Sequence, residues 1–320
     1  MRNSRWKHAT LALILLVITA GFTLLLQTRQ GIAASRNEPL LTSHKTTAPW
    51  ADRTDLNLIT LPAPPFEYQH QLSTSIQSKP SDHLQLHLIQ AKPNSITDQE
   101  EWLNNNNLLL PGYQVSHSPR TIRENLPGFI PERFRGQILV KAIPCKETIL
   151  LIYGADFGEN RYLVAVDASS GEYRYGFDFI NYAYSPEYLR KDKAFVYQRM
   201  YWAFIEDDIL YVSHAHSTYA RSSRGLNAYI TAIDSKTANR LWRSRPLVAN
   251  AENFEIIGHT IITGYGFTNE PDYLYLLDKR TGEVYQQFKL KAGPELILIK
   301  DKQLYVRTYN TDYLFAIDRP

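Results

Sequence analysis

Tyr162-Leu-Val-Ala-Val-Asp167 is the first of four short stretches that share one pattern: an aromatic residue, four mostly apolar residues and an aspartate. The other three are Tyr229-Ile-Thr-Ala-Ile-Asp234, Tyr273-Leu-Tyr-Leu-Leu-Asp278 and Tyr313-Leu-Phe-Ala-Ile-Asp318. By the numbers of their tyrosines, successive copies begin 67, 44 and 40 residues apart. A repeat of about 40 to 50 residues is long enough for one sheet of four short strands. The pattern therefore predicts a fold built from several such sheets, with an insertion in the first interval.

The residues after each aspartate predict a hairpin turn. Asp167 is followed four residues later by Gly171, and Asp278 by Gly282, whereas the second repeat has Ala238 at this place. An aspartate that opens a turn accepts backbone N–H groups, and a glycine adopts positive φ without steric cost. We therefore predict that these residues are structural and not catalytic. The predicted turn residues are Asp167, Gly171, Asp234, Asp278, Gly282 and Asp318.

Further short motifs surround these turns. Leu210-Tyr211-Val212 and Leu304-Tyr305-Val306 each precede a repeat, and Leu241-Trp242 follows one. Together with the turns, they resemble the repeat of the PQQ-like, or quinoprotein-like, β-propellers over residues 137–318. The resemblance implies an all-β fold, a PQQ-like β-propeller of about four recognisable four-stranded blades. The chain departs from the family pattern at Ala238, where the family has glycine, and no other repeat has a tryptophan at the place of Trp242.

Apolar alternation around the repeats predicts the strands of each blade. The first blade is predicted at 137–143, 148–154, 161–167 and 172–179, and the second at 195–204, 208–214, 228–234 and 239–244. The third is predicted at 253–257, 260–265, 272–278 and 283–289, and the fourth at 294–299, 302–308 and 312–318.

The fourth blade lacks a predicted outermost strand after Asp318. Without one, its third strand would leave backbone N–H and C=O groups unpaired along a sheet edge, which proteins normally avoid. Leu84, Leu86 and Leu88 alternate with polar residues, which is typical of a half-buried strand. We predict that residues 84–90 pair with residues 313–318 and so join the two ends of the repeat region.

Residues 9–26 contain no charged side chain, and a helix of this length spans about 27 Å, close to the hydrocarbon thickness of a bilayer. Two arginines and a lysine lie within residues 1–8, so the positive-inside rule puts that end in the cytoplasm. We expect a single-pass signal anchor in the inner (plasma) membrane and an extracytoplasmic, periplasmic C-terminal domain. The alternative is a signal peptide cleaved near Ala34, which would give a secreted protein.

Two segments separate the predicted anchor from the repeats. Residues 27–77 are polar and rich in proline, without a sustained period of 3.6 or 2, and are predicted to be a linker. Residues 78–136 are predicted to be an α/β or irregular segment that supplies the closing strand. Within it, Thr97 with Glu100 three residues later predicts a capped, short helix. Residues 137–320 then hold the propeller repeats.

Composition excludes several classes of site. The single cysteine, Cys145, rules out an intrachain disulfide framework and a cysteine-based zinc cluster. The net charge is +3, but lysines and arginines are mixed with acidic residues, so we expect no nucleic-acid partner. No catalytic residue and no cofactor is expected. Because of the family resemblance, an oxidoreductase using PQQ with calcium is kept as the alternative.

Two groups of side chains are weak candidates for binding. His214 and His216 lie two apart at a predicted strand end, where residues on one face could share a metal, although no third ligand is identifiable. Aromatic residues cluster around the start of the second blade and could form a stacking surface for a glycan or peptide. The candidates for this ligand surface are Tyr184, Tyr188, Tyr201 and Trp202. We expect the domain to be a non-enzymatic scaffold of the cell envelope with a protein or glycan partner.

The membrane anchor gives a first testable prediction. The mature protein should retain residues 1–26 and sediment with membranes after a carbonate wash, because an uncleaved apolar helix stays in the bilayer. Mass spectrometry of the amino terminus and immunoblotting of the washed pellet measure both properties. Soluble protein that begins near Ser35 would contradict the anchor and support cleavage.

Overall fold

The computed structural model describes residue 50 and residues 56–64, 83–116, 122–124, 126–182, 197–216, 225–267 and 270–318. All of them belong to one compact unit, Lys45–Pro320. The predicted anchor, residues 9–26, lies outside the described residues and stays a prediction. Within the described ranges, no helix is long and apolar enough to cross a membrane.

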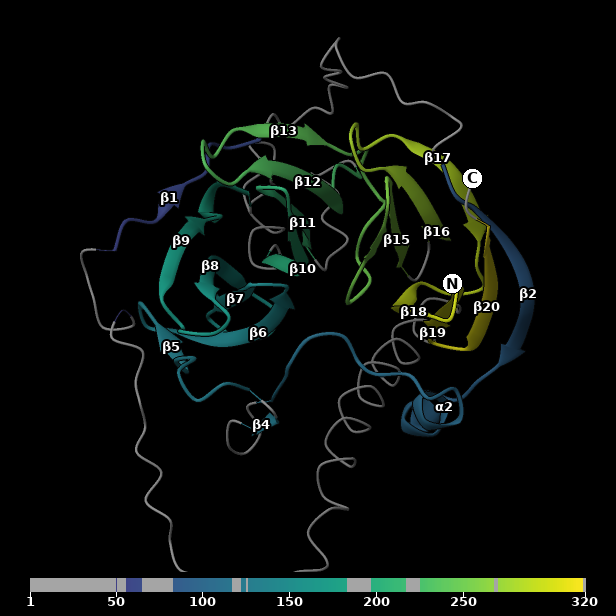
Figure 1. Cartoon of the computed structure of the whole chain (residues 1–320). Coiled ribbons are helices and arrows are strands. Elements are labelled where there is room, and N and C mark those ends of the chain that lie inside the picture. Colours follow the sequence, from purple (N-terminus) through teal and green to yellow (C-terminus); the bar gives the residue numbers. More distant parts are fainter. Residues whose placement is uncertain are drawn as a thin grey trace, which may run out of the picture. The chain divides into compact units, whose positions relative to one another are not determined.

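The described unit is all-β and propeller-like, with four sheets that follow one another along the chain (Figure 1). The first sheet has the order β1-β9-β8-β7-β6-β5, and each of the other three has four strands. The first sheet consists of β1 (Ile59–Thr60), β5 (Arg133–Phe134), β6 (Gln137–Cys145), β7 (Thr148–Gly154), β8 (Asn160–Asp167) and β9 (Tyr173–Asp178). The second consists of β10 (Gln198–Glu206), β11 (Ile209–His216), β12 (Tyr229–Asp234) and β13 (Arg240–Arg243).

The third and fourth sheets continue the pattern. The third consists of β14 (Glu255–Ile257), β15 (Thr260–Phe267), β16 (Glu270–Asp278) and β17 (Val284–Lys289). The fourth consists of β18 (Pro294–Lys300), β19 (Gln303–Thr308), β20 (Thr311–Asp318) and β2 (Gln85–Pro93). Each strand predicted from the repeats has an observed counterpart whose ends agree within a few residues. The four-sheet, all-β prediction is confirmed at this level.

The strand that completes the fourth sheet comes from before the repeat region, as predicted, and precedes every strand of the first sheet except β1. β2 pairs antiparallel with β20, from Gln85 opposite Asp318 to Pro93 opposite Thr311. Leu86 is 2% exposed and packs with the apolar residues between the third and fourth sheets. His83, just before β2, stacks on Tyr285 and bonds Asp278 at 2.8 Å. The closing strand is therefore held by both neighbouring sheets.

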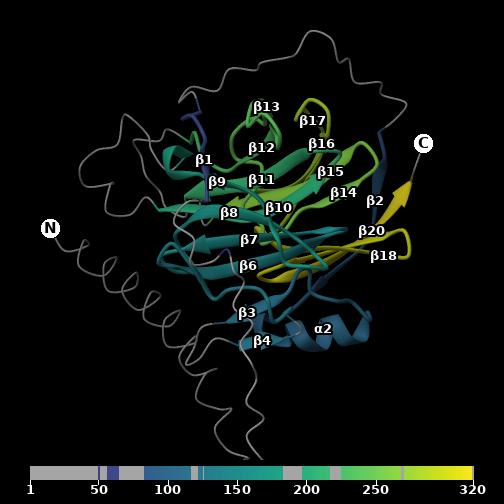
Figure 2. The ribbon, with the colours of Figure 1, turned by 60° about the vertical axis from the view of Figure 1, so that its left-hand side comes forward.

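A short helical segment connects the fourth sheet to the first. η2 (Ile96–Asp98) and α2 (Gln99–Asn105) lie on the same side of the sheets as the pair β3 (Gln114–Ser116) and β4 (Ile122–Glu124) (Figure 2). Trp102 and Leu108 pack against β18, and the Tyr113 N–H donates to Ala142 O of β6 at 2.8 Å. The segment thus contacts the inner strands of both sheets.

The helix was predicted correctly, but its cap was not. Ser95, and not Thr97, caps the preceding turn η2, in a capping box completed by Asp98 instead of Glu100. Asp98 is in turn the N-cap residue of α2, without a side-chain cap bond. Asp98 also pairs with the buried Arg307, whose guanidinium lies over Trp102. This ion pair holds Asp98 in place, and it therefore favours a helical segment that begins after Ser95 over one that begins after Thr97.

The predicted linker over residues 27–77 needs a correction. β1 pairs in parallel with β9, and Leu61 is 1% exposed in the core. Trp50 packs on Phe134 and donates its indole N–H to Gly171 O at 2.8 Å. These apolar side chains are spaced too irregularly to show a period, so the sequence pattern missed them. Apart from residue 50 and residues 56–64, this range lies outside the described residues.

The repeat turns have the predicted chemistry. Asp167 and Asp234 each accept two backbone N–H bonds from the turn that follows. The Ser169 hydroxyl, together with these backbone bonds, lowers the pKa of Asp167, and the backbone N–H of Thr237 is the largest cause of the lowered pKa of Asp234. Gly171 and Gly282 have φ of +73° and +75°. A Cβ at Gly282 would lie 2.4 Å from the Trp242 ring, and one at Gly171 equally near the Phe129 ring. The positive φ favours glycine at both positions, and the aromatic ring stacked on each turn leaves no room for a Cβ.

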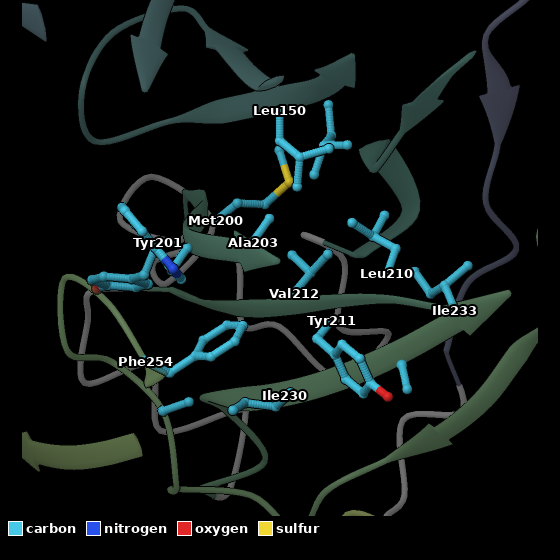
Figure 3. Packing of buried hydrophobic residues seen from close by; sticks show 14 of the residues in the cluster. Leu150, Met200, Tyr201, Ala203, Leu210, Tyr211, Val212, Ile230, Ile233 and Phe254 are labelled. Carbon is cyan, nitrogen blue, oxygen red and sulfur yellow. The ribbon is translucent and has the colours of Figure 1, made fainter. Parts of the chain in front are cut away.

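Buried apolar residues from the first three sheets form the largest core cluster, part of which Figure 3 shows between β7, β10, β11 and β12. Two asparagines add links between sheets. Asn160 bonds both backbone groups of Met200 in β10, and Asn253 bonds both backbone groups of Ile297 in β18. Each amide therefore acts like a strand neighbour and fixes the position of the next sheet.

A buried charge in the closing strand should destabilise the whole unit. Leu86→Asp is expected to cost about 4 kcal/mol or more, because it places a carboxylate among apolar side chains. Thermal unfolding followed by circular dichroism should show one transition at a lower temperature. Gln90→Asp, on the exposed part of the same strand, is the control and should change little. Equal effects of the two variants would contradict the closing role of β2.

Candidate functional site

Both predicted histidines lie in β11, where His214 is buried and His216, the last residue of the strand, is half-buried with its backbone N–H and O bonded to the side chain of Asn227. His214 is 4% exposed, its Nε2 lies 2.8 Å from Thr231 Oγ1, and its ring contacts Tyr182 and Tyr229. Burial and the nearby Arg243 lower the pKa of His214 to about 3, so the ring is neutral. Among the described residues, no group of three or more His, Cys, Asp or Glu side chains is placed to hold a metal ion.

The predicted aromatic surface is only partly described. Tyr201 and Trp202 are 5% and 8% exposed and belong to the largest core cluster, so they present little area to a ligand. The stacking partners of both rings are basic side chains, Arg199 for Tyr201 and Lys141 for Trp202. Tyr184 and Tyr188 lie outside the described ranges, and for them the prediction stands.

Charged residues that the sequence analysis did not select meet where the sheets converge. Lys141 of β6 donates to Tyr201 O at 2.7 Å, to Glu252 O at 2.9 Å and to Glu252 Oε2 at 2.8 Å. Arg199 of β10 bonds Glu252 Oε1 at 2.5 Å. The Glu252 N–H donates to Glu295 O of β18. One carboxylate and two cations therefore join residues of the first, second and fourth sheets to the segment that leads into the third. We call Lys141, Arg199 and Glu252 the axial triad.

The axial triad is largely surrounded by protein yet not sealed. Burial lowers the pKa of Lys141, Glu252 opposes this effect, and Arg199 adds to it. Burial also acts to raise the pKa of Glu252, but the attraction of Lys141 and Arg199 prevails and the pKa lies below its usual range. The side chains keep 19%, 25% and 42% exposure for Lys141, Arg199 and Glu252 respectively. Solvent therefore reaches Glu252 although it lies among four sheets.

The chemistry of the axial triad is structural. A lysine ammonium has three N–H donors, and all three of Lys141 are used by the protein. These three acceptors hold the lysine as an ammonium, which has no lone pair for nucleophilic attack. Glu252 has both oxygens engaged by cations, so it is a poor ligand for calcium. The triad consequently does not fit a site for calcium-bound PQQ, and no reaction step follows from it.

Two further carboxyl groups, those of Glu255 and Glu295, have pKa values that are raised instead of lowered. Burial raises the pKa of Glu255 in β14 to about 7. Burial also raises the pKa of Glu295, with Arg307 opposing and Glu252 reinforcing the effect. Cys145 is 4% exposed, and burial raises the pKa of its thiol to about 11. The cysteine is therefore an unreactive thiol at neutral pH.

No protein-family model matches the chain, and no curated protein matches it. Among solved structures, the computationally designed Ika8 protein is 9% identical with a TM-score of 0.38, covering 56% of this chain and 46% of that one. BamB from Moraxella catarrhalis is 11% identical with a TM-score of 0.33, covering 56% and 58%. A europium-containing methanol dehydrogenase is 8% identical with a TM-score of 0.35, covering 52% and 39%.

The chain thus spans between 39% and 58% of the length of these three structures. At such low identities and TM-scores, no function or residue role is transferred from them. Because no family model matches, the resemblance of the repeats to PQQ-like propellers stays a prediction at the level of the family.

Glu255 gives a prediction about pH. A carboxyl with a raised pKa binds its proton more tightly in the native than in the unfolded chain, so stability falls as pH rises from about 4.5 to about 7. Glu255→Gln removes this loss. Between about pH 5 and pH 8, the unfolding free energy of the wild type should fall by about 2 kcal/mol more than that of the variant.

Chemical denaturation at each pH measures this difference. Glu159→Gln, which changes an exposed glutamate in the turn before β8, is the matched control and should follow the wild type. Parallel curves for wild type and Glu255→Gln would show that the Glu255 carboxyl does not titrate in a buried environment.

Proposed function

We propose that this chain is a non-enzymatic binding and scaffolding module of the cell envelope, held at the membrane by residues 9–26 with the propeller-like unit outside the cytoplasm. In the main form of this proposal the partner is a protein. In its second form the partner is a glycan, bound at the aromatic residues Tyr184 and Tyr188.

The outer edge of the fourth sheet carries this proposal. β2 is the last strand of its sheet, is nine residues long, and has eight exposed positions. Leu88 and Ile89, in its middle, are 54% and 52% exposed. An edge strand offers unpaired backbone N–H and C=O groups that an extended segment of a partner can bind. Apolar side chains at its centre add contact area for that segment.

The first sheet offers a precedent within the same chain. Its outer strand β9 receives β1 as an added parallel strand. The outer strands of the second and third sheets, β13 and β17, have only four and six residues. β2 is thus the longest outer strand among the described sheets, which supports it as the docking edge.

The reactive side chains described below are bonded or buried within the protein, which also supports a binding role over catalysis. Lys141 uses all its donors within the protein, His214 is neutral and bonded to Thr231, and Cys145 is buried. The alternative, an oxidoreductase using PQQ and calcium, is not favoured by any of these contacts.

Site-specific crosslinking tests the proposal. The full chain, with a photoreactive residue in place of Leu88, is expressed in the cells that naturally make it. Illumination should give one discrete crosslinked product, an adduct with a partner protein. Ile89→Lys should weaken that adduct, because it puts a charge next to the probe in an apolar contact. Phe157→Lys, at another exposed apolar residue, is the matched control and should leave it unchanged. No adduct, or equal effects of both lysine variants, would refute docking at β2.

A thermal melt separates this proposal from its alternative. A ligand that binds only the native state raises the melting temperature by mass action. Because the proposed module does not bind PQQ, its melting temperature should be unchanged at saturating PQQ and calcium. A clear rise would favour the oxidoreductase.

A further inference from the structure

A cavity of about 320 Å³ opens between the first and second sheets. Pro62 and Ala63, after β1, form one wall, and Tyr182 of η3 (Ile180–Tyr182) forms another. The third wall is the run Ala238-Asn239-Arg240, where the second repeat turns into β13. A volume of this size is at the lower end of the ~300–1,000 Å³ typical of small-molecule sites.

The walls from the first sheet are fixed by hydrogen bonds. The Leu61 N–H donates to Asp178 O at 3.1 Å, and Asn181 Nδ2 donates to Leu61 O at 2.8 Å. The Tyr182 ring makes edge contacts with Phe179 and His214, each with ring centroids 5.0 Å apart. The cavity is therefore lined by positions that are set before any ligand arrives.

The third wall lies at an equivalent place in three repeats. The Asp234 N–H donates to Asn239 O at 2.9 Å, and Asp167 with Glu172 and Asp278 with Glu283 make the same bond at 2.8 Å. Ala238 has φ of +60°, close to the values at Gly171 and Gly282. The three turns therefore share one backbone conformation, and their side chains can be compared position by position.

The side chains of the second turn differ at all three cavity positions. The first and third turns read Gly171-Glu172-Tyr173 and Gly282-Glu283-Val284, whereas the second reads Ala238-Asn239-Arg240. An acidic residue is thus replaced by a neutral amide, and an uncharged residue by a cation. The glycines of the first and third turns, Gly171 and Gly282, are covered by the rings of Phe129 and Trp242 respectively. The second turn instead borders the cavity, so the departures coincide with the open space.

Three of the six residues that line the cavity, Tyr182, Asn239 and Arg240, carry side-chain hydrogen-bond donors. Arginine offers a forked pair of N–H groups that suits carboxylate and phosphate, and asparagine and tyrosine add an amide and a hydroxyl. Burial raises the pKa of Tyr182 to about 12, although Arg240 and Arg243 act to lower it, so the phenol keeps its proton as a donor. Arg243 lies with its guanidinium 4.3 Å from the centre of the Tyr229 ring and adds positive charge nearby.

We propose that the cavity between the first and second sheets binds a small polar molecule through an oxyanion group, carboxylate or phosphate, recognised by Arg240, Asn239 and Tyr182. The site goes beyond the protein-docking edge of β2 and lies on other sheets. Loss of one binding activity would leave the other intact.

Three sugars that differ only at carbon 6 test the proposal. Glucose, glucuronate and glucose 6-phosphate carry a hydroxymethyl, a carboxylate and a phosphate ester at that position. Isothermal titration of the full chain in detergent should show binding of at least one anionic sugar and weaker or no binding of glucose. The anion that binds more tightly identifies which oxyanion the site prefers. Equal affinity for glucose, or no binding of either anion at millimolar concentration, would overturn the proposal.

Asn239→Glu puts back the residue that the other two turns have at this position. It should keep the fold, because Glu172 and Glu283 occupy the same backbone conformation. It should weaken binding of the anionic sugar about tenfold or more, because it places a carboxylate beside the bound anion. Glu283→Asn, the reciprocal change in the third turn, is the control and should leave affinity unchanged. Unchanged affinity in Asn239→Glu, with a normal circular dichroism spectrum, would refute recognition at this turn.

Discussion

The ammonium group of Lys141 is the point on which the arrangement of the sheets depends. It binds a carbonyl of the second sheet, and a carbonyl and a carboxylate just before the third. Glu252 passes the connection on to Arg199 and to the backbone of Glu295. The Lys141 ammonium is 19% exposed and is stable there only when its acceptors are in place, since a largely desolvated charge needs hydrogen-bonded partners. The axial triad therefore favours the one packing of the sheets that satisfies it.

Apolar packing and asparagine amides extend this constraint outward. Asn160 and Asn253 each bind both backbone groups of one residue in the next sheet, which fixes its height as well as its distance. Trp242 then covers the turn of the third sheet. The interfaces between sheets thus combine non-directional burial with a few directional bonds, and the latter decide which of many compact packings is adopted.

The sequence predicted the repeating part well, because each repeat carries its own local signals. The apolar alternation before Asp167, Asp234 and Asp278 set the strands, and the need to pair the edge of β20 pointed to β2. It predicted the candidate sites poorly. Lys141, Arg199 and Glu252 are 58 and 53 residues apart in sequence and belong to no motif, so only the folded chain brings them together. Tyr201 and Trp202 looked available as aromatic residues, but their strand faces the core. Residues 238–240 differ from the corresponding residues of the other two turns, which the sequence alone shows. Only the structure shows that these three residues line a cavity.

The pairing of β2 with β20 also has a consequence for the order of events during biosynthesis. Among the strands described, only β1 is made before β2, whereas its partner β20 is made after all the others. Gln85 and Asp318 can therefore pair only after the three other sheets have been synthesised. Contacts so distant in sequence form slowly, because the loop between them must be ordered first. Until β20 is made, β2 has no partner strand in its own sheet. Such a chain therefore depends more on a chaperone that shields the unpaired strand than a chain in which each sheet is completed by the residues that follow it directly.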